Sequence, residues 1–248
     1  YISYDMNSAY AHALKNTYMP ITSGELKTIT DITELDNYRY YVVRLNIDCS
    51  NFKFMKSKED GHYCNLDIQF FKDANIKYSI VEDDVDNLIV YNDVVPIGRY
   101  LTCIDKLYDL KKQGSKLSGR MLSMMHGMMT SKCTYRQRRD EPWDEQNEKW
   151  KVNIFKTGTK YYYYTKQFPF RYRQFARIKP FLYATIRINM YNIMKTLDMD
   201  RIKRVYVDSI LTDEIMNNGL IGSELGQMKI ETISSYIKEM ENQEEDYD

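Results

Sequence analysis

The sequence contains no apolar run of the roughly 20 residues that a membrane-spanning helix requires, so it predicts a protein without a membrane partner. Its few cysteines are widely spaced, which favours free thiols in a reducing compartment over a disulfide framework: Cys49, Cys64, Cys103 and Cys133. His62 stands close to Cys64, but no further ligand with zinc-site spacing accompanies the pair. We therefore expect an intracellular protein, in the host cytoplasm or, for a viral protein, in the virion.

The sequence also lacks net charge, because 35 Lys and Arg balance 35 Asp and Glu. Taken whole, this balance argues against a nucleic-acid-binding protein, but the charges are segregated along the chain. Residues 101–140 hold nine basic and three acidic side chains, and residues 166–204 hold ten and two. The acids gather elsewhere, notably at 82–86 and 239–248. Such segregation can produce a basic cleft on a neutral molecule.

The chain does have enough material for a folded core, with 248 residues of which 43% are hydrophobic and 28% charged. Runs of β-forming residues predict strands and hairpins at residues 1–4, 38–48, 87–91, 150–165 and 204–212. Apolar residues at helical spacing predict helices at residues 9–14, 101–132 and 181–197. Gly114 and Gly119 divide the second of these into two helices or a helical hairpin, and the polar segment 133–151 is expected to be a loop.

One carboxylate near the chain start is well placed for metal binding. Residues 1–4 form a predicted buried strand that ends at Asp5, and Ser8 is positioned to cap the helix that follows. A second carboxylate, Asp208, is expected on a strand of the hairpin at 204–212. Two carboxylates on neighbouring strands can hold divalent metal ions.

Between these two aspartates the sequence predicts a basic helix face. Lys112, Lys116 and Arg120 are spaced i, i+4 and i+8, so one continuous helix would project all three from one side. A basic face of this kind can bind a triphosphate. Together with Asp5 and Asp208 it forms the minimal set for two-metal nucleotidyl transfer, in which one metal activates the attacking hydroxyl and the other steadies the leaving pyrophosphate.

A further basic stretch, at residues 171–177, alternates arginines with aromatic side chains. Arg171, Arg173 and Arg177 alternate with Tyr172 and Phe175. The arginines are predicted to follow a nucleic-acid backbone while the rings stack on bases. An amphipathic edge with solvated arginines is the alternative.

These motifs resemble those of family B DNA polymerases, most closely the protein-primed branch of phages, viruses and linear plasmids. Residues 5–11 (DMNSAYA) resemble the first palm motif, D-x-x-S-L-Y-P. The resemblance implies that Asp5 binds both metals and that Tyr10 excludes a ribose 2′-hydroxyl. Residues 205–212 (VYVDSILT) resemble Y-x-D-T-D-S-I, which makes Asp208 the second metal ligand.

The fingers helix of that family carries K-x-x-x-N-S-x-Y-G, and residues 116–127 (KLSGRMLSMMHG) occupy its place in the order of motifs. Gly127 matches the glycine and His126 replaces the tyrosine. Ser123 replaces the asparagine, and Arg120 falls one residue from the family lysine.

Two further segments extend the resemblance over nearly the whole chain. Residues 180–194 resemble the helix before the last palm motif, with Arg187 at its usual basic position, and residues 225–231 (LGQMKIE) are similar to the segment beyond that motif. The family's exonuclease domain would precede Tyr1, and its thumb would follow Asp248.

The resemblance implies the α+β class: a right-hand polymerase palm with an antiparallel sheet and a helical fingers insertion. The implied segments are palm at 1–24, palm continuation with an insertion at 25–100, fingers at 101–132, palm at 133–230, and a tail or the start of a thumb at 231–248. The implied cofactors are two Mg²⁺ ions, or Mn²⁺. The implied partners are a DNA template and primer, deoxynucleoside triphosphates and, if priming is by protein, a terminal protein.

The candidate binding residues fall into two groups. Those expected to bind the nucleotide are Tyr10, Lys112, Lys116 and Arg120. Those expected to contact nucleic acid are Arg171, Arg173, Arg177 and Arg187.

Two alternatives stay open. A palm without catalysis would bind nucleic acid or serve in assembly, because Tyr206 stands where the family has another Asp and the fingers motif is altered. A reverse transcriptase is the other alternative, since residues 206–211 look like Y-x-D-D-I-L with one Asp lost. Against it, about 200 residues separate Asp5 from Asp208, and no L-P-Q-G-like segment lies between them.

Overall fold

The structure, a computed structural model, describes the chain except residues 84, 131–132, 140–149, 155–159, 169–172 and 234–248. Between residues 130 and 174 it describes the backbone only. No helix within these described parts has both the length and the apolar character needed to cross a membrane.

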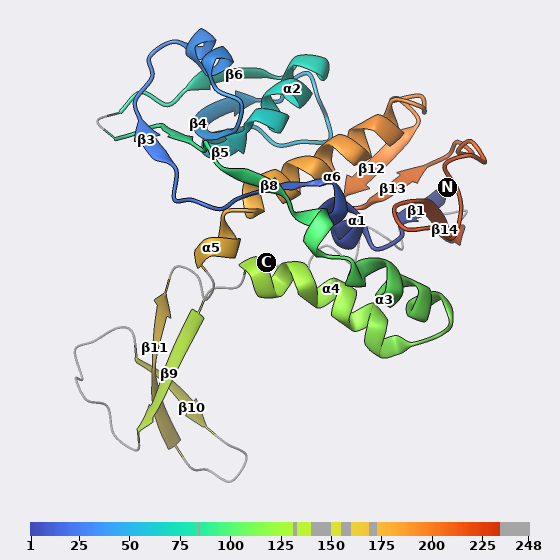
Figure 1. Cartoon of the computed structure of the whole chain (residues 1–248). Coiled ribbons are helices and arrows are strands. Elements are labelled where there is room, and N and C mark those ends of the chain that lie inside the picture. The colour runs from blue at the N-terminus through green and yellow to red at the C-terminus, as the bar shows by residue number, and fades with distance from the viewer. Residues whose placement is uncertain (84, 131–132, 140–149, 155–159, 169–172, 234–248) are drawn as a thin grey trace.

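A four-stranded antiparallel sheet joins the first strand of the chain to the last strands that the structure describes (Figure 1). Its strand order is β12–β13–β1–β14. The central strand β1 (Ile2–Met6) pairs on one side with β13 (Ser209–Thr212) and on the other with β14 (Met228–Ile233). The outer strand β12 (Ile202–Tyr206) forms a hairpin with β13. The sheet therefore brings the first residues beside residues from beyond position 200.

Side chains of β1 divide between a core and an open face. Because successive side chains of a strand point to opposite faces, the buried Tyr4 and Met6 enter the core and Asp5 between them points away from it. Helices α1 (Ala9–Asn16) and α6 (Lys179–Met194) contact each other and share this core with the sheet. Each fully buried large apolar side chain there stabilises the fold by about 1.5–3 kcal/mol.

A second antiparallel sheet lies beside the first and forms the other lobe in Figure 1. Its central strand is β4 (Tyr41–Asp48), which pairs along one edge with β5 (Lys58–Cys64). Along the other edge it pairs first with β7 (Leu88–Val90) and then with β6 (Lys77–Ile80), while β3 (Glu25–Lys27) pairs with β7. The strand expected at 38–48 thus begins at Tyr41, and that expected at 87–91 is confirmed as β7.

Helix α6 contributes to the cores of both sheets. Its buried Tyr191 packs edge-on against Phe70 of α2 (Asn65–Asp73), with ring centroids 5.1 Å apart. Arg187 of α6 donates two hydrogen bonds to Asp67 of α2, and the side chain of Asp67 is fully buried. The helix predicted at 181–197 is confirmed, although it runs from residue 179 to 194.

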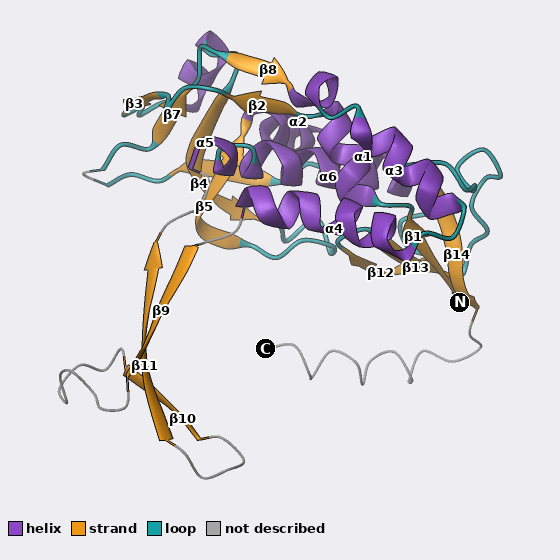
Figure 2. Ribbon diagram, turned by 60° about the horizontal axis from the view of Figure 1, so that its bottom comes forward, coloured by secondary structure: helices purple, strands orange, loops and turns teal. Residues whose placement is uncertain are grey.

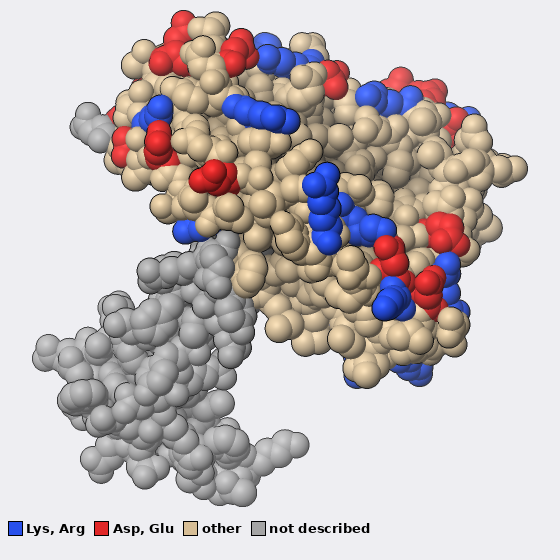
Figure 3. Space-filling view, viewed as in Figure 1, with Lys and Arg blue, Asp and Glu red and all other residues tan. Residues whose placement is uncertain are grey.

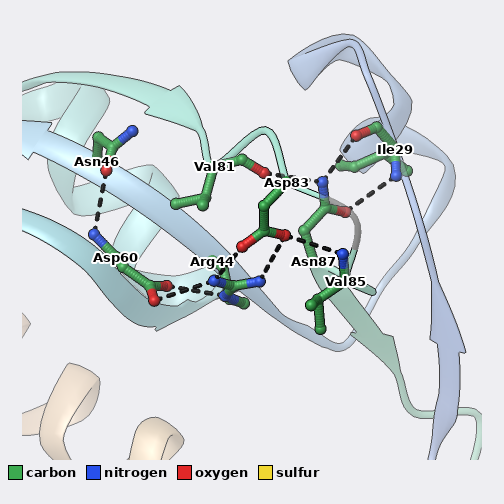
Figure 4. A network of polar contacts seen from close by, with 8 residues as sticks. All are labelled: Ile29, Arg44, Asn46, Asp60, Val81, Asp83, Val85 and Asn87. Atoms are coloured by element: carbon green, nitrogen blue, oxygen red, sulfur yellow. Dashed lines mark hydrogen bonds and ion pairs between the residues drawn. The ribbon is translucent and has the colours of Figure 1, made fainter.

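A polar network closes one edge of the second sheet (Figure 4). Arg44 of β4 forms paired hydrogen bonds with Asp60 of β5 and with Asp83. The buried amide of Asn87 accepts from the Ile29 N–H and donates to the Ile29 carbonyl. Asp83, in the acidic segment at 82–86, is therefore paired with Arg44 at the surface of this sheet.

A helical hairpin confirms the expectation for residues 101–132. Helices α3 (Cys103–Lys112) and α4 (Lys116–Thr130) pack on each other, and Gly114 between them adopts φ 96°. That left-handed conformation suits glycine because it has no Cβ. Gly119 lies inside α4 and does not interrupt it.

Three strands project from the body as an arm in Figures 1 and 2. β10 (Trp150–Ile154) and β11 (Lys160–Phe168) are antiparallel, as the hairpin prediction requires, and the turn between them lies outside the described residues. β9 (Cys133–Arg139) pairs with the other edge of β11. The prediction of a loop at 133–151 is therefore wrong for residues 133–139. This polar sequence has no clear strand pattern, and its strand forms because β11, about 30 residues away, supplies the backbone hydrogen bonds.

Short elements complete the described chain. β2 (Tyr18–Pro20) pairs with β8 (Val94–Pro96) between the two sheets. The remaining elements are the 3₁₀ helices η1 (Ile32–Asn37) and η2 (Ile97–Tyr100) and the short helix α5 (Arg173–Ala176) before α6.

Candidate active site

The sheet brings Asp5, on β1, beside Asp208, which lies in the turn between β12 and β13 rather than on a strand as expected. Asp5 of β1 lies opposite Ser209 of β13, the residue after Asp208. The Met6 N–H donates to the Asp208 carbonyl oxygen over 2.8 Å. Two residues about 200 positions apart in sequence are thus neighbours in the fold.

A strained turn carries Asp208. Tyr206 and Ser209 are the last paired residues of the β12–β13 hairpin, which leaves Val207 and Asp208 as a two-residue loop. Val207 has φ 46°. Two-residue hairpin turns need a positive φ at the first loop position and usually have Gly there, and a β-branched residue in that conformation is strained.

Replacing Val207 with Gly should therefore stabilise the chain. We expect Val207→Gly to raise the free energy of unfolding by about 1 kcal/mol, because the relief of backbone strain exceeds the added flexibility of the unfolded chain. Urea denaturation followed by circular dichroism measures the change. Val205→Gly in the regular strand β12 is the matched control and should destabilise; equal losses in both variants would show that Val207 is unstrained.

The charges of the two carboxylates affect each other. Burial and the charge of Asp5 together raise the pKa of Asp208 above its usual value. Such a shift means that the pair resists holding two negative charges without a cation nearby.

Lys229 supplies such a cation, and the sequence analysis did not single it out. It lies directly opposite Asp5 across the β1–β14 ladder. Its Nζ is 3.0 Å from Oδ2 of Asp5. The hydrogen bond to Asp5 raises the pKa of Lys229. The only sequence signal was the motif-like segment 225–231, in which no strand was predicted.

Lys111 is a second cation that sequence reasoning missed. Its Nζ donates to Oγ of Ser8 over 2.7 Å. Burial and the charge of Lys229 lower the pKa of Lys111, whereas the charge of Asp5 acts in the opposite direction. Through this hydrogen bond Lys111 connects α3 to the turn between β1 and α1.

The same contact corrects the prediction for Ser8. It precedes α1 with φ 52° and ψ 52° and makes no side-chain capping bond. A cap residue normally has extended backbone geometry, from which its oxygen can reach the first turn. Ser8 instead accepts a hydrogen bond from outside the helix.

The predicted basic helix face is wrong in its geometry. Gly114 ends one helix before the next begins, so Lys112 closes α3 while Lys116 and Arg120 lie in the first turns of α4. Lys112 forms an ion pair with Glu224 at 3.1 Å. Lys116 and Arg120 are exposed.

Tyr10 stacks on His126. The rings of Tyr10 in α1 and His126 in α4 lie 3.7 Å apart between centroids, with 10° between their planes. Burial, followed by the charges of Tyr183 and Asp208, raises the pKa of Tyr10. Burial lowers the pKa of His126, which favours a neutral imidazole in the stack. Tyr10 therefore lies close to both Asp208 and α4.

The four predicted nucleic-acid-binding arginines are not brought together by described contacts. Arg187 is engaged by the buried Asp67. Arg177 donates to the Ile21 carbonyl oxygen over 3.3 Å. Arg171 lies outside the described residues, and only the backbone of Arg173 is described. Contact of these arginines with nucleic acid stays a prediction.

Basic and acidic side chains are interspersed on the face seen in Figure 3. Side chains are not described between residues 130 and 174, a range that includes the end of the basic segment 101–140 and the start of the basic segment 166–204. The basic cleft suggested by charge segregation is therefore not evident on this face among the described residues.

The carboxylate pair is suited to Mg²⁺ as part of a larger ligand set. The described residues contain no group of three or more His, Cys, Asp or Glu side chains arranged to hold a metal. Mg²⁺, however, is commonly bound by one or two carboxylates together with water and substrate phosphates. Asp5 and Asp208, with the raised pKa of Asp208, fit that partial role.

Comparison with known proteins finds a relationship at the level of structure. No protein-family profile and no curated protein matches the sequence. Two solved structures of Phi29 DNA polymerase are similar to the chain. The complex with primer-template DNA, a post-translocation binary complex, has a TM-score of 0.59 and 16% identity. The complex with single-stranded DNA has a TM-score of 0.58 and 17% identity.

Each comparison covers 92% of this chain and 41% of the polymerase chain. The chain therefore spans less than half the length of the polymerases that it resembles. At these identities the similarity concerns the fold. Together with its antiparallel sheets and helical hairpin, it shows that the chain has a polymerase-like fold.

Proposed function

We propose that the chain is the palm and fingers part of a template-directed DNA polymerase of the family B, protein-primed type. The observation that carries the proposal is the meeting of Asp5, on β1, with Asp208, in the turn that leads into the neighbouring strand β13. Each comes from a stretch that resembles a palm metal motif, and the polymerase-like fold supports the same assignment.

The proposed reaction is attack of a primer 3′-hydroxyl, or of a protein hydroxyl, on an incoming deoxynucleotide. Asp5 and Asp208 would hold two Mg²⁺ ions. Bound there, the ions would supply activation of the attacking hydroxyl and neutralisation of the leaving pyrophosphate. Triphosphate binding and discrimination between sugars would be carried out by side chains of the chain itself.

Cationic side chains would bind the triphosphate. Lys111 reaches the turn at Ser8, three residues after Asp5, and is the best placed of them. Lys116 and Arg120 are exposed in the first turns of α4 and can approach the triphosphate if α4 moves toward the sheet. Lys112 has a weaker claim, because Glu224 already engages it.

Tyr10 would discriminate between sugars. In this role its ring blocks the space that a ribose 2′-hydroxyl would occupy. The stack on His126 and the burial of Tyr10 hold the ring in one orientation, which such a steric role requires. α3 and α4 would then be the fingers within residues 101–132. The four-stranded sheet, within 1–24 and 133–230, would be the palm, and residues 25–100 would be its continuation with an insertion.

Primer extension tests the proposal. The chain should add the complementary nucleotide to a labelled primer on a DNA template in the presence of Mg²⁺, and EDTA or Asp208→Asn should abolish the addition. Asp213→Asn is the matched control, because this exposed aspartate pairs with Arg201 away from the site. Binding of the primer-template without any extension would contradict catalysis and support a palm that only binds nucleic acid.

A further inference from the structure

The Lys229–Asp5 ion pair joins two strands at the carboxylate site. The two residues face each other in the ladder, and Lys229 Nζ lies 3.0 Å from Asp5 Oδ2. The side chain of Lys229 is 45% exposed and that of Asp5 is 23% exposed. A charge on this half-open sheet face can reach both the carboxylate and the solvent.

Three carboxylates act on the Lys229 ammonium group. Asp5 binds it directly, and the charges of Glu231 and Asp208 also act on it. Glu231 lies two residues further along β14, at the irregularity where the pairing with β1 shifts register, and its charge raises the pKa of Lys229. Lys229 therefore has a second carboxylate within its own strand to which its ammonium can move.

A divalent ion at Asp5 and Asp208 would need the carboxylate oxygens that Lys229 now approaches. The ammonium and the metal ion would also repel each other at close range. A lysine side chain is a flexible four-carbon stem with a compact charge, so it can swing aside without movement of the backbone.

We propose that Lys229 is an internal counter-ion that competes with the metal for Asp5, so that a divalent ion binds only by displacing its ammonium toward Glu231. The inference rests on the proposed function, since it concerns the same metal site. Lys229 thereby weakens metal binding in the empty site. An incoming triphosphate brings its own metal and negative charge, which favours exchange of the lysine for the metal at the moment of nucleotide binding.

Manganese titration tests the inference without a measurement of activity. Free Mn²⁺ is followed by electron paramagnetic resonance with the wild-type chain, Lys229→Gln and Lys203→Gln. Lys203 is an exposed lysine on β12 of the same sheet, so its replacement removes the same charge elsewhere. We expect Lys229→Gln to bind Mn²⁺ about tenfold more tightly than the wild type, and Lys203→Gln to match the wild type within about twofold.

Thermal unfolding supplies a second readout. In EDTA, Lys229→Gln should have a lower midpoint than the wild type, because two carboxylates then lack their cation, and added Mn²⁺ should raise that midpoint more than it raises the wild type's. Lys229→Arg, which keeps the charge, should retain weak Mn²⁺ binding. Equal or weaker Mn²⁺ binding by Lys229→Gln would overturn the inference.

Asp5→Asn separates this inference from the proposed function. If the wild type binds Mn²⁺ and Asp5→Asn does not, the metal site stands, and only the comparison with Lys229→Gln decides the role of the lysine. If Asp5→Asn binds Mn²⁺ as the wild type does, the proposed metal site itself fails.

Discussion

Asp5→Asn should reduce nucleotide incorporation by at least about 10³-fold, the scale expected when several kcal/mol of metal-dependent charge stabilisation is lost from the transition state. The amide cannot supply the negative charge that a divalent ion needs, and Asp208 alone would hold such an ion weakly. DNA affinity should change little, because Asp5 lies among other carboxylates and contributes no cation to the DNA backbone. Single-turnover primer extension measures the first quantity, and fluorescence anisotropy of labelled DNA measures the second.

Asp105→Asn is the matched control for this variant. Asp105 is an exposed carboxylate of α3 that pairs with Lys15, so the substitution makes the same chemical change outside the site. Its incorporation rate should equal that of the wild type. Incorporation by Asp5→Asn at the wild-type rate would exclude the metal role of Asp5.

Arg187→Leu should destabilise the chain by about 3 kcal/mol or more, since removal of one partner leaves an uncompensated buried charge. Asp67 is completely buried and accepts from Nε of Arg187 at 2.9 Å and from the Cys64 N–H at 3.0 Å. Burial raises the pKa of Asp67, against the opposing effect of the guanidinium. Without Arg187 the carboxylate must take up a proton or the helix pair α2–α6 must open. Urea denaturation measures the loss.

Two comparisons show whether the effect comes from the buried pair. Arg201→Leu removes an exposed arginine paired with Asp213 and should cost about 1 kcal/mol or less. Asp67→Leu added to Arg187→Leu should recover part of the stability, because no buried charge then remains. If Arg187→Leu costs no more than Arg201→Leu and instead weakens DNA binding, the prediction that Arg187 contacts nucleic acid would be preferred.

The sequence predicted those helices and strands whose characteristic pattern lies within one short segment of the chain. The hairpin at 204–212 combines two β-forming runs with a short turn. The helix predicted at 181–197 has continuous apolar spacing, and Pro180 lies in the first turn of α6. The strand at the chain start is confirmed as β1, although it runs through Asp5 to Met6. The pairing of that strand with the hairpin followed from the motif order rather than from periodicity.

Elements that depend on distant partners could not be predicted in the same way. β14 has only one buried side chain, that of Met228, so its sequence does not show the alternation of a half-buried strand. Its position is fixed by pairing with β1, more than 220 residues earlier. Lys229 was missed for this reason, since its role depends on Asp5, the residue opposite it on β1.

The basic helix face failed for a different physical reason. The spacing of Lys112, Lys116 and Arg120 matches a continuous helix, but Gly114 takes a left-handed conformation that ends the first helix. Periodicity does not register a break of three residues between helices of similar composition. Lys111, one position earlier, points to the site instead.

The central claim is that Asp5 and Asp208 together hold the catalytic metal. The most direct measurement is the anomalous scattering of Mn²⁺ in crystals of the chain grown with a deoxynucleoside triphosphate. The account predicts a peak between the two carboxylates, about 2 Å from an oxygen of each. A map in which Mn²⁺ binds the triphosphate alone, with no peak beside either aspartate, would contradict it.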